Sequence, residues 1–344
     1  MTVNLIESWN GIDNFAEMVP KWTSEGGAPL NSGAGRFGET NGSINQISSG
    51  YAVSADPLNP GTSDKLIIGF GYKTDATQVD IVATAPWTIV EFRHGTDQMC
   101  KIVLNADNTI SAVTDAAVQH TSLHTVLAQT WHYIEVKILL NNGAGTCQFQ
   151  IDGAVGEAEG TNLDTLFNGS ACDNVRWIST GTNEDWALDD CYLGDSSPAG
   201  AMDFLGDTRV ITLLPDGDDS VQFTPTEGDN HSGVDDTQTV VADTTYNESN
   251  TSGHKDLFTM SASGIDPADT IHGITVNMWT QKVDAGAADM RLELDSNAVT
   301  DTSSAFTQTT SYGWFSKFHP LNIDGNVAWT STTVDAVKAG YSRV

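Results

Sequence analysis

Basic side chains are scarce in this sequence. Its 344 residues include 15 Lys and Arg against 45 Asp and Glu, which gives a formal net charge of −30 at pH 7. The acidic residues are spread along the whole chain, so the charge belongs to the protein as a whole and not to a tail. Because such a surface repels phosphate groups and anionic lipids, we expect neither nucleic acid nor a membrane among the partners.

Long apolar runs are also missing. No stretch approaches the roughly 18 apolar residues that a membrane-spanning helix needs. Residues 1–10 have neither the basic start nor the apolar centre of a signal peptide. We therefore expect synthesis in a cytoplasm, with any export by another route.

Cysteine is rare, and no Cys-x-x-Cys pair is present, which argues against a zinc site. Cys100 and Cys147 fall on the apolar positions of alternating segments, as small core residues do. We therefore expect the cysteines to be free thiols. The alternative is a disulfide, for which Cys172 and Cys191 are the candidates, and it would require an oxidising compartment.

Catalytic signatures are absent as well. Some β-sandwich glucanases place three carboxylates on one strand as E-x-D-x-x-E, whereas the central strand here offers only Glu135 followed by Lys137. Glu91 and Arg93 are interpreted as a surface pair. No G-x-S-x-G elbow is present, and no Ser, His and Asp cluster. We predict no catalytic residue and no enzymatic activity.

Metal-binding patterns are incomplete, so we predict no metal and no cofactor. His120 and His124 lack the Glu of the H-E-x-x-H pattern, and we interpret them as a polar loop pair. Asp216, Asp218 and Asp219 resemble only a fragment of a calcium loop and are interpreted as solvated turn carboxylates.

Alternating strands are what the sequence does contain. In residues 131–153 two alternating apolar segments flank the turn Asn-Asn-Gly-Ala-Gly, which predicts an antiparallel hairpin with one apolar face. Leu66, Ile68 and Phe70 alternate with Gly69 and Gly71, so we expect another segment to lie close to the glycine side. Further strands are expected at 88–93, 98–104, 109–113, 175–179, 186–193, 274–279, 290–295 and 312–319, with a hairpin turn at 284–287 and a helix at 332–338.

The Trp-His start and Asp-Gly end of residues 131–153 resemble the centre of laminin-G and concanavalin A-like jelly-roll domains. The segment WALDDCYLGD at 186–195 resembles their closing strand. The resemblance covers roughly residues 1–195 and implies a jelly roll of that kind. It also implies that Asp189 and Asp190 lie where such domains sometimes bind calcium, although we interpret both as solvated turn carboxylates. The fold hosts lectins, hydrolases and structural modules, so it does not decide the function.

A second resemblance follows a linker at 196–203. Residues 204–344 contain, in order, FLGDTRV, LLPDGD, FTPTEG, VDD, DTTY, GHKD and VDAVKAG. This order resembles a module of uncharacterised tailed-phage virion proteins, where it commonly follows a laminin-G-like domain. We therefore predict an all-β chain with a jelly roll at 1–195 and a smaller β-sandwich at 204–344.

These resemblances imply a bacteriophage virion protein without enzymatic activity. It would be a structural component on the outer surface of the particle, as a capsid decoration, head fibre or tail accessory protein. Its partners would be capsid or tail proteins and copies of itself, most simply a trimer that tightens as salt screens the charge of −30. Lys317, Lys338 and Arg343 are candidates for the docking face. The alternative is a carbohydrate-binding adhesin or receptor-binding protein that recognises host glycans, for which nine Trp residues could supply stacking surfaces.

Overall fold

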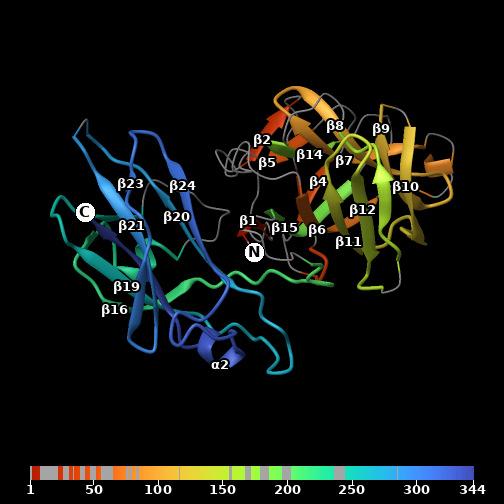
Figure 1. Ribbon diagram of the computed structural model, residues 1–344. Coiled ribbons are helices and arrows are strands. Elements are labelled where there is room, and N and C mark those ends of the chain that lie inside the picture. The colour runs from red at the N-terminus through yellow and green to blue at the C-terminus, as the bar shows by residue number, and fades with distance from the viewer. Residues whose placement is uncertain are drawn as a thin grey trace. The chain divides into compact units, whose positions relative to one another are not determined.

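A computed structural model describes residues 2–7, 22–25, 31–33, 35–38, 43–46, 52–55, 65–74, 77, 80–82, 85–115, 117–154, 157–166, 172–178, 186–195, 203–235, 245–284 and 286–344. The chain divides into two compact units, residues 1–210 and 211–344. Both are built from antiparallel strands (Figure 1). No helix among these residues is long and apolar enough to span a membrane.

Unit 1 contains a sheet of eight strands, here called sheet A. Their order is β13–β12–β11–β6–β15–β4–β3, with β1 also paired to β15. The strands are β1 (Thr2–Glu7), β3 (Asn31–Gly33), β4 (Ser43–Gln46), β6 (Lys65–Thr74), β11 (His132–Leu139), β12 (Gly145–Ile151), β13 (Gly160–Leu163) and β15 (Trp186–Asp195).

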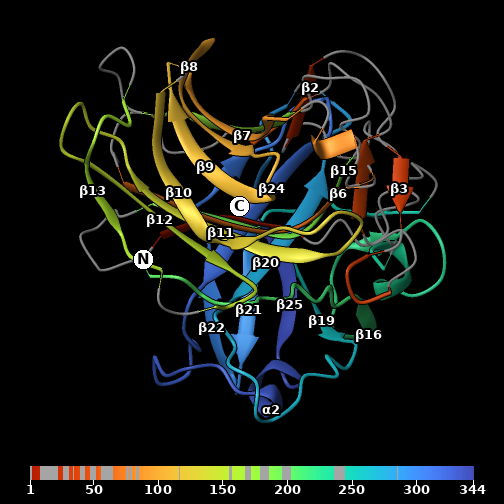
Figure 2. The ribbon, with the colours of Figure 1, turned by 90° about the vertical axis from the view of Figure 1, so that its right-hand side faces the viewer.

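The second sheet of unit 1, sheet B, has seven strands in the order β10–β9–β8–β7–β14–β5–β2. Figure 2 shows how strongly β8, β9 and β10 curve. The strands are β2 (Trp22–Glu25), β5 (Ala52–Ala55), β7 (Trp87–His94), β8 (Asp97–Leu104), β9 (Thr109–Thr114), β10 (Ala117–Thr125) and β14 (Asn174–Ile178).

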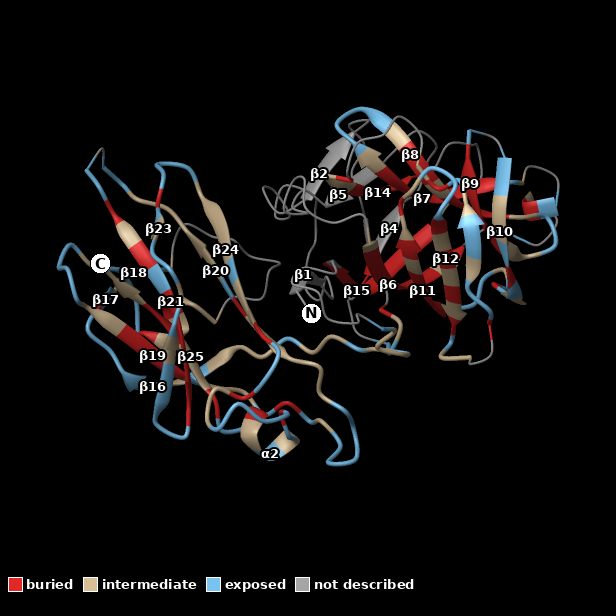
Figure 3. Cartoon of the chain, in the orientation of Figure 1, coloured by how far each residue is buried: buried red, intermediate tan, exposed pale blue. Residues whose placement is uncertain are grey.

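One apolar core joins the inner faces of the two sheets. Phe70 and Phe149 of sheet A and Trp177 of sheet B are all completely buried in it. Buried residues follow β6, β11 and β15 along their length (Figure 3). Because each strand turns alternate side chains inward, this packing produces a jelly-roll sandwich. The prediction of an all-β fold whose first part is a two-sheet sandwich is confirmed.

The central hairpin has the predicted register. Ile134, Val136 and Ile138 of β11 lie opposite residues 151, 149 and 147 of β12. All four cysteines are buried free thiols, and Cys100 and Cys147 lie in the core as expected. Burial raises the pKa of the Cys100 thiol to about 12, which keeps it protonated.

Unit 2 is built on a six-stranded sheet, sheet C, in the order β16–β19–β25–β21–β22 with β23 beside β21. Its strands are β16 (Pro215–Ser220), β19 (Lys255–Met260), β21 (Asp289–Ser296), β22 (Val299–Thr302), β23 (Phe306–Thr307) and β25 (Lys338–Arg343). Two ribbons accompany it, β17 (Thr224–Pro225) with β18 (Asn247–Glu248), and β20 (Ile274–Thr280) with β24 (Gly313–His319). Short helical turns are η2 (His231–Gly233) and α2 (Ser331–Val334).

The apolar core of unit 2 lies between the β20–β24 ribbon and sheet C. Val276 of β20 packs with Leu292 and Leu294 of β21, and Trp329 and Val334 close the cluster. The second unit is thus the smaller β-sandwich that the sequence predicts.

Several local predictions are wrong. Residues 284–287 do not close a hairpin, because β20 pairs with β24 and β21 pairs with β25. The helix ends at Val334, and Lys338 already belongs to β25. Residues 117–125 form β10 and not a loop. The predicted helix at 332–338 is shorter than expected because the chain from Lys338 onward forms β25, a central strand of sheet C.

Candidate functional site: a polar clamp on the outer face of sheet A

The strap, residues 203–210, lies on the outer face of sheet A within unit 1. It contains the FLGDTRV motif, which the sequence grouped with the second module. Phe204 and Leu205 pack against Ile67, Tyr133 and Tyr192 of the sheet. The domain limits 1–195 and 204–344 stay a prediction, and residues 196–202 of the predicted linker 196–203 lie outside the described residues.

Two glycines of β6 make room beneath this surface. A Cβ on Gly69 would lie 2.1 Å from Cε1 of Tyr192, and one on Gly71 would lie 3.1 Å from Cδ of Arg36. Side chains of any size would therefore displace the ring and the arginine. The prediction that another segment lies close to the glycine side of β6 is confirmed.

Glu135 and Arg36 both bind the strap, and we call their contacts the polar clamp. Glu135 forms one half of it. It points outward from β11 because its neighbours, residues 134 and 136, point into the core, and it is completely buried beneath the strap. Its carboxylate accepts hydrogen bonds from the Tyr192 hydroxyl and from the amides of Leu205 and Gly206, at 2.8 and 3.1 Å for the two amides. Gly206 has a φ of +87°, a conformation that brings consecutive amides to one anion.

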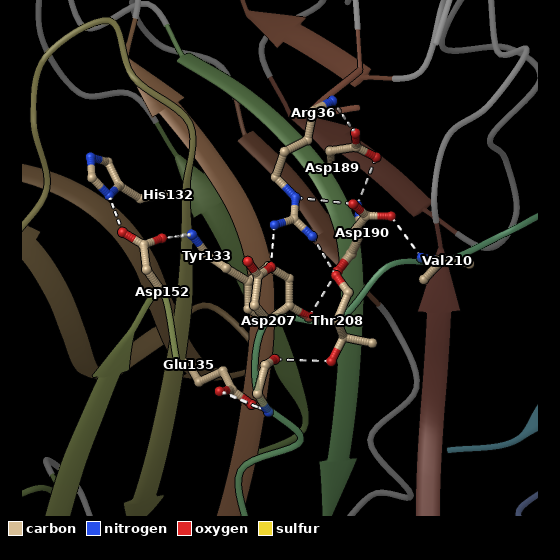
Figure 4. A network of polar contacts seen from close by, with 11 residues as sticks. Arg36, His132, Tyr133, Glu135, Asp152, Asp189, Asp190, Asp207, Thr208 and Val210 are labelled. Atoms are coloured by element: carbon tan, nitrogen blue, oxygen red, sulfur yellow. Dashed lines mark hydrogen bonds and ion pairs between the residues drawn. The ribbon is translucent and has the colours of Figure 1, made fainter. Parts of the chain in front are cut away.

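Arg36 forms the other half. Its side chain is 7% exposed, its Nε donates to Asp190 Oδ2 at 3.1 Å, and its guanidinium also bonds Asp207 and the carbonyl of Thr208 in the strap. The same guanidinium lies 4.7 Å from the ring centroid of Tyr133. One cation therefore ties a loop, a sheet strand and the strap together (Figure 4).

Asp189 and Asp190 are not the solvated turn carboxylates that we predicted. Both are 2% exposed and lie in β15, where the register shifts. Asp189 accepts from the amides of Arg36 and Asp190, each at 2.7 Å, while Asp190 accepts from Arg36 and, at 2.8 Å, from the amide of Val210. The guanidinium of Arg36 therefore binds Asp190, whereas Asp189 binds backbone amides. No group of three or more His, Cys, Asp and Glu side chains suited to a metal ion occurs in the described part of the chain.

The Trp-His and Asp-Gly ends of the central hairpin also have structural partners. Asp152 accepts from the amide of Tyr133 at 2.8 Å and lies 2.6 Å from Nδ1 of His132. Nε2 of His132 accepts from the amide of Leu127 at 2.9 Å, so the proton of this neutral ring is on Nδ1. These contacts fix the base of the hairpin, and Trp131 itself is only half-buried, unlike the core residues Trp177 and Trp186.

His120 and His124 both lie on β10. The ring of His120 stacks on Phe149 at a centroid distance of 5.7 Å, and burial lowers its pKa. Glu157 is buried nearby and accepts from the amide of Leu123 at 3.0 Å, and burial raises the pKa of its carboxyl. Both histidines therefore lie on β10, which is an edge strand of sheet B.

The acidic residues of β16 in unit 2 are exposed on a strand and not in a turn. Asp216 accepts from the Thr259 hydroxyl at 2.8 Å, and Asp218 accepts from the amides of residues 230 and 231. Asp219 pairs with Lys338 at 2.7 Å. Each carboxylate thus has a protein donor.

Arg36 and Asp207 were missed by the sequence reasoning. Arg36 lies in a glycine-rich stretch without periodicity, and Asp207 lies in a motif that the sequence grouped with the second module. The one available signal was the glycine side of β6, which indicated a close segment but not its identity.

The clamp makes the stability of unit 1 depend on pH. Burial raises the pKa of Glu135 to about 7, since desolvation outweighs the three donors that favour the charged form. The folded state then holds a proton that the unfolded chain releases near pH 4.5, so this stabilisation is fully present at low pH and is lost as pH rises from about 4.5 to 7. We expect the unfolding free energy to fall by about 3 kcal/mol over that range through this group.

The measurement is urea unfolding of the full chain from pH 4.5 to 7.5, followed by hydrogen exchange at the β6 and β11 amides. Glu135→Gln is the matched variant, because its amide oxygen can still accept from Tyr192 and Leu205 without titrating. It should lose this component of the pH dependence. An identical pH dependence in both proteins would contradict the assignment.

No protein-family model matches the sequence, and no curated protein matches it significantly. Among solved structures, the chain is similar to the binding domain of Paraclostridial Mosquitocidal Protein 1, with a TM-score of 0.38 and 14% identity over 50% of this chain and 44% of that one. It is also similar to the exoplasmic/lumenal domain of VIP36 in a Ca2+/Man2-bound form, with a TM-score of 0.38 and 10% identity over 57% and 89%. A third similar structure is Trypanosoma rangeli sialidase, with a TM-score of 0.33 and 9% identity over 50% and 30%. The chain therefore spans less than half of the first structure and less than a third of the last.

Proposed function

We propose that this protein is a non-enzymatic structural component of a tailed-phage particle, on its outer surface as a capsid decoration, head fibre or tail accessory protein. The phage assignment rests on the ordered motifs of residues 204–344. The observation that supports a structural role is that the buried carboxylates of both units bind other parts of the same chain.

Unit 2 repeats the pattern that the clamp shows in unit 1. Asp256 is completely buried and accepts from the amides of residues 222 and 223 and from Asn230. Glu293 accepts from the hydroxyls of Ser342 and Thr302 and pairs with Lys255 at 3.3 Å. A general acid or a nucleophile must instead reach a substrate. These acids serve to fix a rigid scaffold.

The proposed partners are capsid or tail proteins and further copies of this chain, most simply as a trimer. The three basic residues suggested for docking have internal contacts: Lys317 pairs with Asp301 at 2.8 Å, Lys338 pairs with Asp219, and Arg343 bonds the carbonyl of Ser249. They therefore lower the negative charge of unit 2 locally. A less acidic face is where self-association of a protein of charge −30 costs least.

The test is a mass-spectrometric inventory of purified particles, together with sedimentation of the isolated protein from low to high salt. We expect a stoichiometric particle component and an oligomer that tightens with salt. Absence from particles and a monomer at every salt concentration would overturn the proposal, and so would turnover of an oligosaccharide that one Asp or Glu substitution abolishes.

The second candidate is a carbohydrate-binding adhesin. Saturable binding on a glycan array would support it, and no binding to any glycan would count against it.

A further inference from the structure

One side of the β20–β24 ribbon in unit 2 contributes to neither apolar cluster of that unit among the described residues. Ile274, Val276 and Met278 of β20 point to the core. Because side chains alternate along a strand and cross-strand partners share a side, the residues between them point the other way. That side has three cross-strand pairs: Thr275 with Phe318, Asn277 with Ser316, and Trp279 with Trp314. We call these six residues, together with Tyr312, the aromatic face.

The rings of the aromatic face pack on one another. Trp279 lies parallel to Tyr312, with 3° between the ring planes and 5.3 Å between the centroids, and its centroid is also 5.3 Å from that of Trp314. A distance this long between parallel rings means an offset stack, in which each ring leaves part of the other uncovered. The four aromatic residues are half-buried, as is most of β20 and β24 (Figure 3). Part of the ring surface is therefore open to solvent.

Asn277 and Ser316 supply the accessible polar groups of this face. Both are exposed and lie opposite each other in the middle of the ribbon, between the Trp279–Trp314 pair and Phe318. An amide and a hydroxyl together offer donors and acceptors. Nε1 of Trp279 and Oγ1 of Thr275 are covered by the chain, so neither can bond a ligand.

The aromatic face contains no charged residue, although the chain has a net charge of −30. Lys317 of β24 lies opposite Val276, on the side of the core, and pairs with Asp301 at 2.8 Å. An anionic ligand would thus find no cation on the face, and a cationic ligand would find no anion. The face matches a neutral ligand that combines apolar surface with hydrogen-bonding groups.

The size of the face distinguishes a small ligand from a protein partner. Each of the two strands has seven residues. Such a ribbon is about 20 Å long and about 10 Å wide, which gives an area on the order of 200 Å². A stable interface between two proteins buries about 800 Å² on each partner. The face is therefore too small to hold a second copy of the chain by itself, but it is long enough for several sugar rings.

We propose that the aromatic face binds a short neutral oligosaccharide. The C–H surfaces of the sugar rings lie on the uncovered parts of the aromatic rings, and sugar hydroxyls exchange hydrogen bonds with Asn277 and Ser316. Aromatic surface with a few well-placed polar groups is typical of small-molecule sites. The inference rests on the second candidate function, for which it names the site and the class of ligand.

The experiment is isothermal titration of the full chain with three neutral probes, cellotetraose, maltotetraose and the tetramer of N-acetylglucosamine. The probes differ in linkage and in substituents but not in charge. We expect saturable binding of at least one of them, accompanied by a change in tryptophan fluorescence.

Substitutions in the face should weaken this binding in proportion to the surface that they remove. Trp314→Ala should weaken it at least about tenfold, which corresponds to about 1.4 kcal/mol. Trp314→Phe retains a ring and should weaken it no more than about threefold, which separates loss of the ring from misfolding. Asn277→Ala, at an exposed position, should weaken it about threefold. Tyr246→Ala removes an exposed ring next to β18 and is the matched control, with no change expected.

Three outcomes would overturn the inference. The first is no binding of any probe, and the adhesin candidate itself fails only if the glycan array is negative too. The second is saturable binding whose affinity is unchanged in Trp314→Ala, which leaves the adhesin candidate standing without this site. The third is self-association that Trp314→Ala abolishes in a protein that binds no saccharide, which would make the face a contact between copies.

Discussion

Replacing Arg36 by Ala should destabilise unit 1 by about 3 kcal/mol. The substitution leaves Asp190, whose side chain is 3% exposed, without its cation, and it frees the carbonyl of Thr208 in the strap. Removing one partner of a buried pair is costly because the remaining charge has lost both its water and its counter-ion. Urea unfolding followed by hydrogen exchange at the β6 and β15 amides measures the effect.

Two further substitutions show whether burial is the cause. Arg291→Ala removes an exposed arginine in unit 2 and should change stability by no more than about 0.5 kcal/mol. Asp207→Ala removes a partner of Arg36 whose side chain is 50% exposed, so we expect a loss of about 1 kcal/mol or less. Equal losses in all three variants would show that the clamp is an ordinary surface contact.

Gly340→Ala should be the most damaging small substitution in unit 2. Gly340 lies in β25 at the centre of sheet C, between Leu257 of β19 and Glu293 of β21. A Cβ there would lie 2.0 Å from the carbonyl oxygen of Asp256 and 3.0 Å from Cα of Leu257. Both contacts are with backbone, so the strands must separate, and we expect a loss of about 3 kcal/mol.

Gly286→Ala is the matched control for this substitution. It lies in an exposed turn, and an added Cβ would meet only the flexible side chain of Asp284, at 3.1 Å. We expect a change within about 0.5 kcal/mol. Thermal unfolding of unit 2, followed by hydrogen exchange at the β19 and β21 amides, compares the two. A loss in Gly340→Ala no larger than in Gly286→Ala would contradict the close approach of β25 and β19.

The sandwich could be predicted from the sequence because alternation of apolar and polar residues with period two shows directly which side chains of a strand face the core. The hairpin at 131–153 and the core positions of Cys100 and Cys147 follow from that pattern. Strand partners in unit 2 were harder to predict. Residues 284–287 are turn-forming, but pairing of β20 with β24 depends on packing of Val276 against sheet C, which local pattern does not encode.

The clamp could not be predicted for a similar reason. Arg36, Glu135 and Asp190 are distant in sequence, and each taken alone is typical of a solvated surface residue. Their burial results from the strap, whose position depends on long-range contacts such as the bond from Leu205 to Glu135, 70 residues apart. For Asp189 and Asp190 the resemblance indicated a possible ion site. In the structure the guanidinium of Arg36 binds Asp190, and backbone amides bind Asp189.

Hydrogen exchange at three strap amides tests the central claim most directly, which is that the buried acids of sheet A bind the strap. The amides of Leu205, Gly206 and Val210 donate to Glu135 and Asp190. Site-resolved exchange of the unmodified protein at pH 6 should show them protected to a degree similar to the amides of β11, since they open only when the clamp opens. Exchange at the rate of an unstructured peptide would contradict the account, because the acids would then lack the partners that make them structural.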